Sequence, residues 1–361
     1  MSSRRCPRCN KIYAEPARFC PQDGSPLIEV SGGSPPSAGS AAPASTPGQR
    51  TLVRQAALAR APAGDRASGL TNSLLDDRYQ VGKKLGEGGM SYVYLARDQS
   101  TAETVAIKVL SPKLSGDQSS VERLRREAGL AMRLEHPNVC RILRLGETED
   151  GLIYLVMPYL PGDLLSDREV KDGPQPLDIG IPLLMQMCRG LQHAHELQII
   201  HRDLKPENVM LVPDPQGPGG ARAVVMDFGL AKERRQEPEV AKLTATGIVL
   251  GTPEFMSPEQ IRGRPLDGRS DVYALGILGF ELFTGQLPFQ GKNAQEMMIA
   301  RLRGKPKGLR EVRPEMPARL ETVFAKSMAL DPADRYPTMT AFAEALAGAE
   351  ESGVFARLFK R

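Results

Sequence analysis

The sequence predicts an α+β protein in which a strand-rich part comes before a mainly helical part. Strand-like apolar runs at residues 79–85 and 92–96 flank a glycine-rich turn. Further along the chain, apolar residues recur with the period of a helix. We expect helices over residues 119–134, 179–197, 270–284, 294–303, 318–329 and 339–347. Ahead of these elements, a cysteine-rich segment and a Ser/Gly/Pro/Ala-rich segment predict a small separate module and a linker.

Residues 1–30 predict a small zinc ribbon. Cys6, Cys9 and Cys20 are three of the chain's five cysteines, and Asp23 stands where the fourth ligand of a ribbon is usually a cysteine. Thiolates on two turns can close a tetrahedral zinc site, to which aspartate can add an oxygen. The segment resembles zinc ribbons of other bacterial proteins. Two alternatives stay open: the site has been lost, or Asp23 only forms an Asp-Gly turn.

The charge of the chain does not identify a partner. The formal net charge is only +4, and the basic residues of the first thirty positions are not accompanied by a series of aromatic residues. Single-stranded nucleic acid is usually held by both kinds of side chain together. We therefore do not expect nucleic acid as the main partner, and we interpret the ribbon as a protein-docking or regulatory module.

The remaining segments outside the main domain are polar or short. Residues 31–73 predict a flexible, disordered linker, because their composition cannot bury enough apolar surface to offset chain entropy. Residues 350–361 form a basic tail whose amphipathic pattern suits either a membrane surface or the rest of the chain. The longest apolar stretch, residues 273–283, is too short to span a membrane. Together with reduced cysteines, these features predict a cytoplasmic protein.

Two short motifs carry the strongest functional signal. Residues 201–208 read His-Arg-Asp-Leu-Lys-Pro-Glu-Asn, and residues 227–229 read Asp-Phe-Gly. This order of a base, a lysine and two metal ligands is the one that phosphoryl transfer from ATP requires. The chain resembles the eukaryotic-type (Hanks-type) serine/threonine protein kinases of bacteria. The resemblance implies a two-lobed kinase domain over residues 76–349, with a β-rich N-lobe and a helical C-lobe.

The resemblance assigns the nucleotide to a glycine-rich hairpin and to the strands behind it. Glycines allow backbone N–H groups to approach phosphates without a Cβ in the way. Ser91 stands where the family usually has a third glycine. The expected ATP contacts in this part of the chain are Leu85, Gly86, Glu87, Gly88, Gly89, Met90, Ser91, Val93 and Ala106.

Further contacts to ATP are implied by a lysine and by the connection between the lobes. Lys108 ends a Val-Ala-Ile-Lys strand and should face the α- and β-phosphates after pairing with Glu127 of the next helix; Glu122 is the alternative, a turn too early. Met157 is the expected gatekeeper. The adenine should then bind the carbonyl of Pro158 and the N–H of Leu160.

The resemblance also implies roles for residues of the catalytic loop, the segment from residue 201 to residue 208. Asp203 should take or orient the proton of the substrate hydroxyl, and Lys205 should neutralise charge on the transferred phosphate. Asn208 and Asp227 should hold magnesium, with manganese as an alternative, and Lys108 and Glu127 complete the catalytic set.

The substrate class follows from residues around the loop. Lys205 and the segment 251–259 resemble those of serine/threonine kinases, in which Thr252 would bridge Asp203 and Lys205. The resemblance further implies a buried ion pair between Glu259 and Arg335. Asp271 would anchor the backbone of the catalytic loop.

Activation is expected to depend on phosphorylation of the segment that follows Asp227. Arg202 precedes the catalytic aspartate, and in the family such an arginine pairs with a phosphate on this segment. Thr244 and Thr246 are the predicted sites. Modification of one copy by another would require self-association.

Three hypotheses remain. The favoured one is an active kinase that phosphorylates Ser/Thr hydroxyls of proteins. A kinase-fold scaffold without activity would be recognised by the failure of the γ-phosphate to move. A nucleic-acid-binding ribbon with an accessory kinase would show salt-dependent binding that is lost without residues 1–30.

Overall fold

The computed structural model describes residues 3–5, 12–14, 28–29, 63–88, 91–110, 118–228 and 253–350, and the chain divides into two units, residues 1–60 and 61–361. In the first unit, β1 (Ser3–Arg5), β2 (Ile12–Ala14) and β3 (Ile28–Glu29) form an antiparallel sheet in the order β2-β1-β3. The predicted zinc ligands Cys6, Cys9, Cys20 and Asp23 lie outside the described residues.

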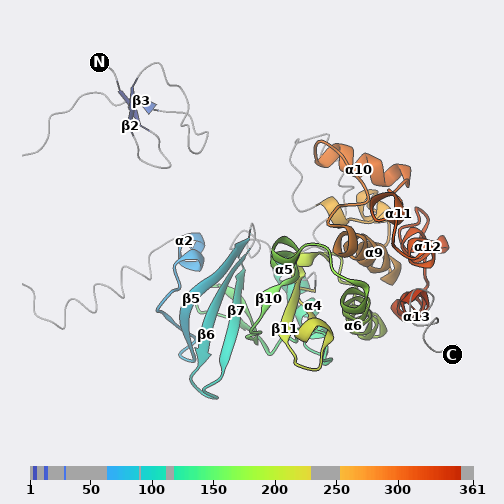
Figure 1. Ribbon diagram of the computed structural model, residues 1–361. Coiled ribbons are helices and arrows are strands. Elements are labelled where there is room, and N and C mark those ends of the chain that lie inside the picture. Colours follow the sequence, from blue (N-terminus) through green and yellow to red (C-terminus); the bar gives the residue numbers. More distant parts are fainter. Residues whose placement is uncertain are drawn as a thin grey trace, which may run out of the picture. The chain divides into compact units, whose positions relative to one another are not determined.

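The second unit begins with a six-stranded antiparallel sheet (Figure 1). Its spatial order is β4-β5-β6-β7-β9-β8. The strands are β4 (Leu74–Leu75), β5 (Tyr79–Gly88), β6 (Ser91–Asp98), β7 (Thr104–Leu110), β8 (Arg144–Glu147) and β9 (Ile153–Pro158). Helix α4 (Gln118–Ala131) lies between β7 and β8 in the chain and contacts β8. These elements form the predicted N-lobe, and one face of the sheet is buried around Tyr79, Tyr94 and Tyr154.

The helical part follows and forms the C-lobe, drawn to the right in Figure 1. β10 (Asp163–Leu164), β11 (Val209–Pro213) and β12 (Ala221–Val225) form a small sheet. β11 begins directly after Asn208, and β12 ends two residues before Asp227. The α-helices are α5 (Leu165–Asp172), α6 (Leu177–Glu196), α8 (Pro258–Ile261), α9 (Gly268–Thr284), α10 (Ala294–Arg303), α11 (Leu309–Val312), α12 (Ala318–Ser327) and α13 (Met339–Glu350). The 3-10 turns are η1 (Pro206–Asn208), η2 (Pro218–Gly220), η3 (Pro253–Phe255) and η4 (Pro332–Asp334).

Helix α9 is the centre of the C-lobe core. Residues on every side of it are buried, which explains why its sequence is continuously apolar from Val272 to Phe280 and not in a stripe. Asp267 caps its first turn by accepting a hydrogen bond from the N–H of Arg269, and Gly285 ends it in the left-handed conformation, at φ 66°. Because α9 contacts α6, α12 and α13, it fixes the elements that hold the catalytic loop.

The folded domain starts earlier than the sequence predicts. Helix α2 (Ala63–Ser68) lies inside the segment expected to be a linker, and Ala67 and Leu70 are buried in the N-lobe core. The hydroxyl of Tyr94 donates a hydrogen bond to the carbonyl of Ala67 at 2.8 Å. The expected boundary at residue 73 is therefore wrong for residues 63–73, because packing against the sheet stabilises a segment with little apolar pattern of its own.

The rest of the expected linker (residues 31–62) and nearly all of the expected basic tail (residues 351–361) lie outside the described residues. Among the helices of the described ranges, none combines the length and apolarity needed to cross a membrane.

Candidate active site

The catalytic loop is held in place by one buried carboxylate. Asp271 of α9 is 1% exposed and accepts hydrogen bonds from the backbone N–H of His201 (2.8 Å) and of Arg202 (3.0 Å). Arg202 has a positive φ of 65°, a conformation that few non-glycine residues adopt. The two bonds from Asp271 support this strained turn directly before Asp203, in agreement with the role that the resemblance implies for Asp271.

His195 completes the surroundings of Asp271. Its Nε2 lies 2.7 Å from the Oδ2 of Asp271, and it approaches from the last turn of α6. Burial alone would raise the pKa of Asp271, but the hydrogen bond and charge of His195 and the contact with His201 bring it below its ordinary value. Asp271 is therefore held as a carboxylate, the form that can accept all of these bonds.

His201 connects the catalytic loop to the segment before Asp227. Its Nε2 lies 2.8 Å from the carbonyl oxygen of Met226, and its Nδ1 accepts a hydrogen bond from the N–H of Asp203 at 3.3 Å. A neutral imidazole has one donor and one acceptor, and both are used here. Burial lowers the pKa of His201, which is consistent with the neutral form. Its ring also packs against Phe228, with 4.7 Å between the ring centroids.

The four polar residues expected to handle phosphate and metal meet in one place. The side-chain N–H of Asn208 donates to the carbonyl oxygen of Asp203 at 2.7 Å. The Nζ of Lys108 on β7 lies 2.8 Å from the Oδ1 of Asp227, so that this ion pair joins the two lobes. Burial opposes ionisation of Asp227, yet the charge of Lys108 beside it lowers its pKa. Asp227 is thus ionised at neutral pH and can act as a ligand for a cation.

The strand register brings the expected nucleotide contacts to one end of the sheet. Gly88 lies opposite Ser91 at the tip of the β5–β6 hairpin, and Ala106 lies opposite Met157. β9 ends at Pro158, two residues before Leu160. Leu85, Gly86, Glu87 and Val93 also lie on this hairpin, whereas Gly89 and Met90 fall outside the described residues.

An apolar cluster lies beneath this end of the sheet. Met157 and Leu160 pack with Cys140 and with Met210, which comes two residues after Asn208. The full cluster consists of Cys140, Val212, Val224, Met157, Leu160, Met210 and Met226. An apolar surface of this kind suits a flat heterocycle. Burial raises the pKa of the Cys140 thiol to about 12, so this cysteine is a packing residue.

Residues 259 and 260 lie at the end of the segment that follows Asp227, called the activation segment here, and Gln260 contacts the catalytic loop. The side-chain N–H of Gln260 donates to the carbonyl of Arg202 at 2.8 Å. Glu259 and Arg335 form the ion pair that the resemblance implies, through Nη1–Oε1 and Nη2–Oε2 contacts of 2.7 and 2.8 Å. Both residues are buried, at 5% and 3% exposure, and Ser270 also donates to Glu259.

The roles expected for several other residues stay predictions. Glu127 lies half-buried on α4, and Lys205 lies in the catalytic loop two residues after Asp203. The pairing of Lys108 with Glu127 stays a prediction, since the ion pair seen for Lys108 is the one with Asp227. Thr244, Thr246 and Thr252 lie outside the described residues.

Sequence reasoning did not identify three residues of this site. His195 contacts Asp271, 76 residues further along the chain, and Gln260 contacts Arg202 of the catalytic loop, 58 residues before it. No local pattern reports contacts over such distances. Met210 comes two residues after Asn208. An apolar side chain so close to an expected metal ligand could have indicated its place in the apolar cluster.

Comparison with known proteins agrees with this geometry. Residues 79–346 match the family described as protein kinase domain. The chain is 39% identical over 270 residues to the serine/threonine-protein kinase pkn3 of Myxococcus xanthus, covering 73% of this chain and 48% of pkn3. It is 38% identical over 283 residues to the tyrosine-protein kinase MasK of the same species, covering 74% and 42%. The crystal structure of the Mycobacterium tuberculosis PknI kinase domain superposes with a TM-score of 0.61 at 27% identity, covering 78% of this chain and 99% of that domain. The chain thus spans less than half the length of these two curated relatives.

Proposed function

This chain belongs to the protein kinase family, and we propose that it transfers the γ-phosphate of ATP to serine and threonine hydroxyls of proteins. One observation carries the proposal. Asp203, Asn208, Lys108 and Asp227 come from three separate segments and form two pairs, Asn208 with Asp203 and Lys108 with Asp227. The backbone hydrogen bond from the N–H of Met226 to the carbonyl of Asn208 links the two pairs. A kinase-fold scaffold without activity would have no need of the complete set.

The residues present fit a magnesium nucleotide. Asp227 is ionised, and Asn208 uses its N–H on Asp203, which leaves the amide oxygen as its metal-binding atom. One carboxylate and one amide oxygen form the hard, oxygen-only donor set that Mg²⁺ prefers, and Mn²⁺ accepts the same set. Asp227 and Asn208 would hold the metal, which would supply positive charge to stabilise the phosphoryl group during transfer.

Each protein group then has a defined task. Asp203 accepts or orients the proton of the substrate hydroxyl, and Lys205 lies two residues further, where it can neutralise the transferred phosphate. Lys108 exchanges Asp227 for the phosphates and is positioned there by Glu127. The glycine-rich hairpin supplies backbone N–H groups, while Met157, Pro158 and Leu160 hold the adenine beside the apolar cluster.

The class of acceptor is the second part of the proposal. Lys205 and residues 251–259 resemble those of serine/threonine kinases, but one relative bears the name of a tyrosine kinase. Purified chain should be incubated with magnesium, ATP labelled at the γ-phosphate and a mixture of unfolded proteins, followed by phosphoamino acid analysis. We expect phosphoserine and phosphothreonine, absent with D203N. Phosphotyrosine alone would refute the acceptor class, and no transfer by any preparation would refute the activity.

We also propose activation by phosphorylation at Thr244 or Thr246, with Arg202 as the cationic partner. A phosphate brings close to two negative charges and three acceptors, enough to order a segment against an arginine. Mass spectrometry after incubation of dephosphorylated chain with ATP should find phosphate at one of these sites. Undiminished activity of the T244A/T246A double variant would contradict the mechanism. Transfer between two copies would make the initial rate of modification rise with the square of the chain concentration.

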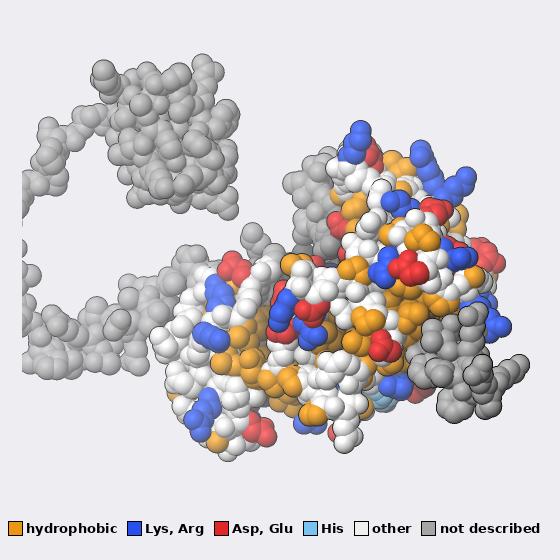
Figure 2. Space-filling view, in the orientation of Figure 1, with side chains coloured by type: hydrophobic (Ala, Val, Ile, Leu, Met, Phe, Trp, Pro, Cys, Tyr) orange, Lys and Arg blue, Asp and Glu red, His pale blue; other side chains and the backbone are white. Residues whose placement is uncertain are grey.

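The N-terminal unit is proposed to hold one zinc ion through Cys6, Cys9, Cys20 and Asp23. In support, β1 ends directly before Cys6 and pairs with β2 and β3, so that a small antiparallel sheet accompanies the cysteines. We assign the unit to protein docking and not to nucleic acid, and the protein to the cytoplasm. On the face of the kinase domain in Figure 2, basic and acidic side chains are interspersed, without the single-sign patch that nucleic acid favours.

A further inference from the structure

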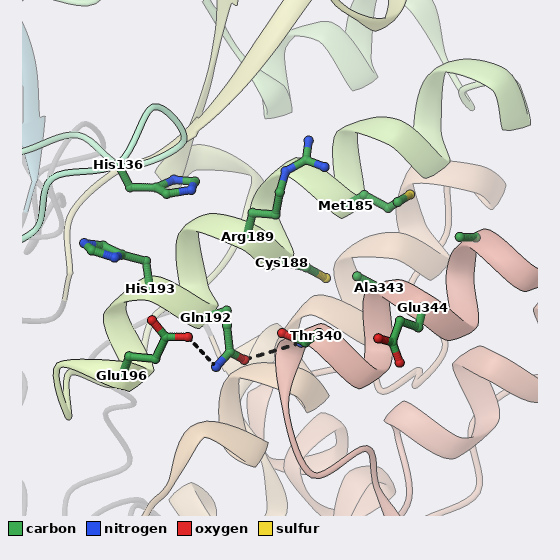
Figure 3. Close-up of a pocket in the computed structure, with 11 residues that line it drawn as sticks. His136, Met185, Cys188, Arg189, Gln192, His193, Glu196, Thr340, Ala343 and Glu344 are labelled. Carbon is green, nitrogen blue, oxygen red and sulfur yellow. Dashed lines mark hydrogen bonds between the residues drawn. The ribbon is translucent and has the colours of Figure 1, made fainter.

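A groove lies on the C-lobe away from the catalytic loop, between α6 and α13 (Figure 3). It has a volume of about 400 Å³. The N–H of Thr340 at the start of α13 donates to the Oε1 of Gln192 on α6 at 3.4 Å. Further along α13, Ala343 lies across from Cys188 in Figure 3. The helix therefore runs along the groove from its Glu196 end toward its Met185 end.

The surface of the groove is largely apolar, and its ionisable lining residues carry both signs of charge: Arg189, His136, His193, Glu196 and Glu344. Its α13 side is the stripe Thr340, Ala343, Glu344 and Ala347, whose spacing of three and four residues keeps one face of the helix. The neighbouring stripe of α13, Met339, Phe342, Leu346 and Ala349, is buried in the C-lobe core. Glu344 and Glu196 are exposed. In Figure 3 they lie apart: Glu196 is in the last turn of α6, and Glu344 follows Ala343 along α13.

We propose that residues 354–361 of the same chain bind in this groove as a short helix, antiparallel to α13. The segment reads Val-Phe-Ala-Arg-Leu-Phe-Lys-Arg and follows the end of α13 after Glu351, Ser352 and Gly353. Loops of two to five residues commonly join antiparallel helices, and a glycine can adopt the left-handed conformation that such a reversal requires. The proposal does not depend on catalytic activity.

The dimensions and the apolar pattern of the segment match the groove. Val354, Phe355, Leu358 and Phe359 fall on one face of a helix, because they are separated by four residues in two pairs. A helix of this segment would be about 12 Å long, and the stripe from Thr340 to Ala347 is about 10 Å long, at 1.5 Å per residue. The aromatic side chains would cover the apolar surface of Met185, Cys188 and Ala343.

The short connection to α13 determines the direction in which the segment lies. After the reversal at Gly353, the chain returns from the Met185 end toward the Glu196 end. Arg357, Lys360 and Arg361 then run back along α13 past Glu344, the acidic residue on the α13 side of the groove. Because the segment is attached to the helix that lines the groove, its effective concentration there is in the millimolar range.

Hydrogen–deuterium exchange of the full chain tests the proposal. We expect the amides of residues 354–361 to exchange at least tenfold more slowly than the intrinsic rate of an unstructured segment. The double variant F355S/F359S should remove this protection, and A343R should do the same by filling the groove. A356S changes the other face of the proposed helix and should leave protection unchanged. Intrinsic exchange rates in the unaltered chain would overturn the proposal without any variant.

Two further results would also overturn it. Protection that grows with chain concentration would show that the groove binds a second copy, and protection seen only with vesicles of phosphatidylglycerol would show that the segment binds membranes. A charge exchange tests direction: E344K should weaken protection, and the combination E344K/R357E should restore it. Failure of the second variant to restore protection while F355S/F359S still removes it would overturn the antiparallel placement.

Discussion

At the scale of single residues, the site depends on side chains whose hydrogen-bonding capacity is fully used. Asp271 accepts from two backbone N–H groups and contacts His195, and His201 uses both ring nitrogens. The reacting residue Asp203 is thus placed by neighbours that do not react. A substitution at a neighbour is expected to act through position, whereas one at the reacting residue acts on the chemistry.

Substitution of the reacting residues should abolish transfer without unfolding the protein. K108M, D203N and D227N each remove a group that handles proton, phosphate or metal, and we expect rates to fall at least a hundredfold. Circular dichroism and steady-state transfer assays measure the two properties together. D163N, which changes an exposed aspartate of β10, is the matched control. Near-normal transfer by D203N would disprove the assignment of Asp203 as the base.

Removing one partner of the buried ion pair between Glu259 and Arg335 should lower the free energy of unfolding more than removing both charges. R335M leaves Glu259 buried without its guanidinium partner, and we expect the free energy of unfolding to fall by about 3–5 kcal/mol. The double variant E259Q/R335M should recover part of this loss, since no charge is then buried alone. Denaturant titration measures both values. A single variant as stable as the original chain would show that solvent reaches the pair.

At the scale of elements, α5 and α9 bring two glutamates close together. Burial and the nearby Glu281 and Glu207 raise the pKa of Glu169 to about 8. Burial and the nearby Glu207 and Glu254 raise the pKa of Glu281 to about 7. Both side chains are half-buried beside η1 of the catalytic loop. The folded state thus retains protons that the unfolded state releases.

Stability should therefore fall as the pH rises through this range. Between pH 4.5, the ordinary pKa of glutamate, and pH 8, the folded chain binds more protons than the unfolded chain, so the free energy of unfolding decreases with pH. E281Q removes one of these groups and should raise stability at pH 8 by about 2 kcal/mol, with little change at pH 4.5. Thermal unfolding at several pH values measures the slope. An unchanged slope in E281Q would show that Glu281 titrates normally.

The N-terminal extension of the kinase domain can be tested by one core substitution. Leu70 is 3% exposed and packs with the N-lobe sheet, so L70A should cost about 2–4 kcal/mol by leaving a cavity. L74A changes a leucine that is 44% exposed on the neighbouring strand and should cost much less. Equal stability of both variants would return residues 63–73 to the status of a linker.

The sequence predicts an element well when residues within or next to it determine its ends, and poorly when the element forms only by packing against distant residues. The bounds of α10 agree with the prediction, because Asn293 caps its start and Gly304 ends it in the left-handed conformation. The other expected helices are present with ends shifted by a few residues. Helix α2 could not be predicted, since its six residues contain no apolar stripe and it forms against a sheet. The same holds for the contact of His195 with Asp271, which only the packing of α6 against α9 creates.

At the scale of the whole molecule, the chain combines a kinase domain with a second unit of its own. The first unit comprises residues 1–60 and the second residues 61–361. The zinc proposal can therefore be tested by substitutions in the first unit that leave the sequence of the catalytic loop unchanged.

Metal content can be measured on the full chain. We expect one zinc per chain by elemental analysis in reducing buffer, and much less in C6S/C9S, because thiolates supply most of the binding energy. C188S, which changes a buried cysteine of α6, controls for the loss of thiols in general. Kinase activity should be equal in all three proteins. A zinc content below a few tenths in the unaltered chain would refute the site.

The hold of Asp271 on the catalytic loop has a consequence for when the active site is formed. The bonds of Asp271, Gln260 and the Met226 carbonyl all lie within the C-lobe, so the backbone around Asp203 is ordered as soon as that lobe folds. The entropy of ordering the loop is lost once, at folding, and not again at each turnover. This is preorganisation in its strict sense. Control is then expected to act through groups that come to this frame from outside it. Lys108, which reaches in from the other lobe, is one such group, and the phosphate proposed to pair with Arg202 is another.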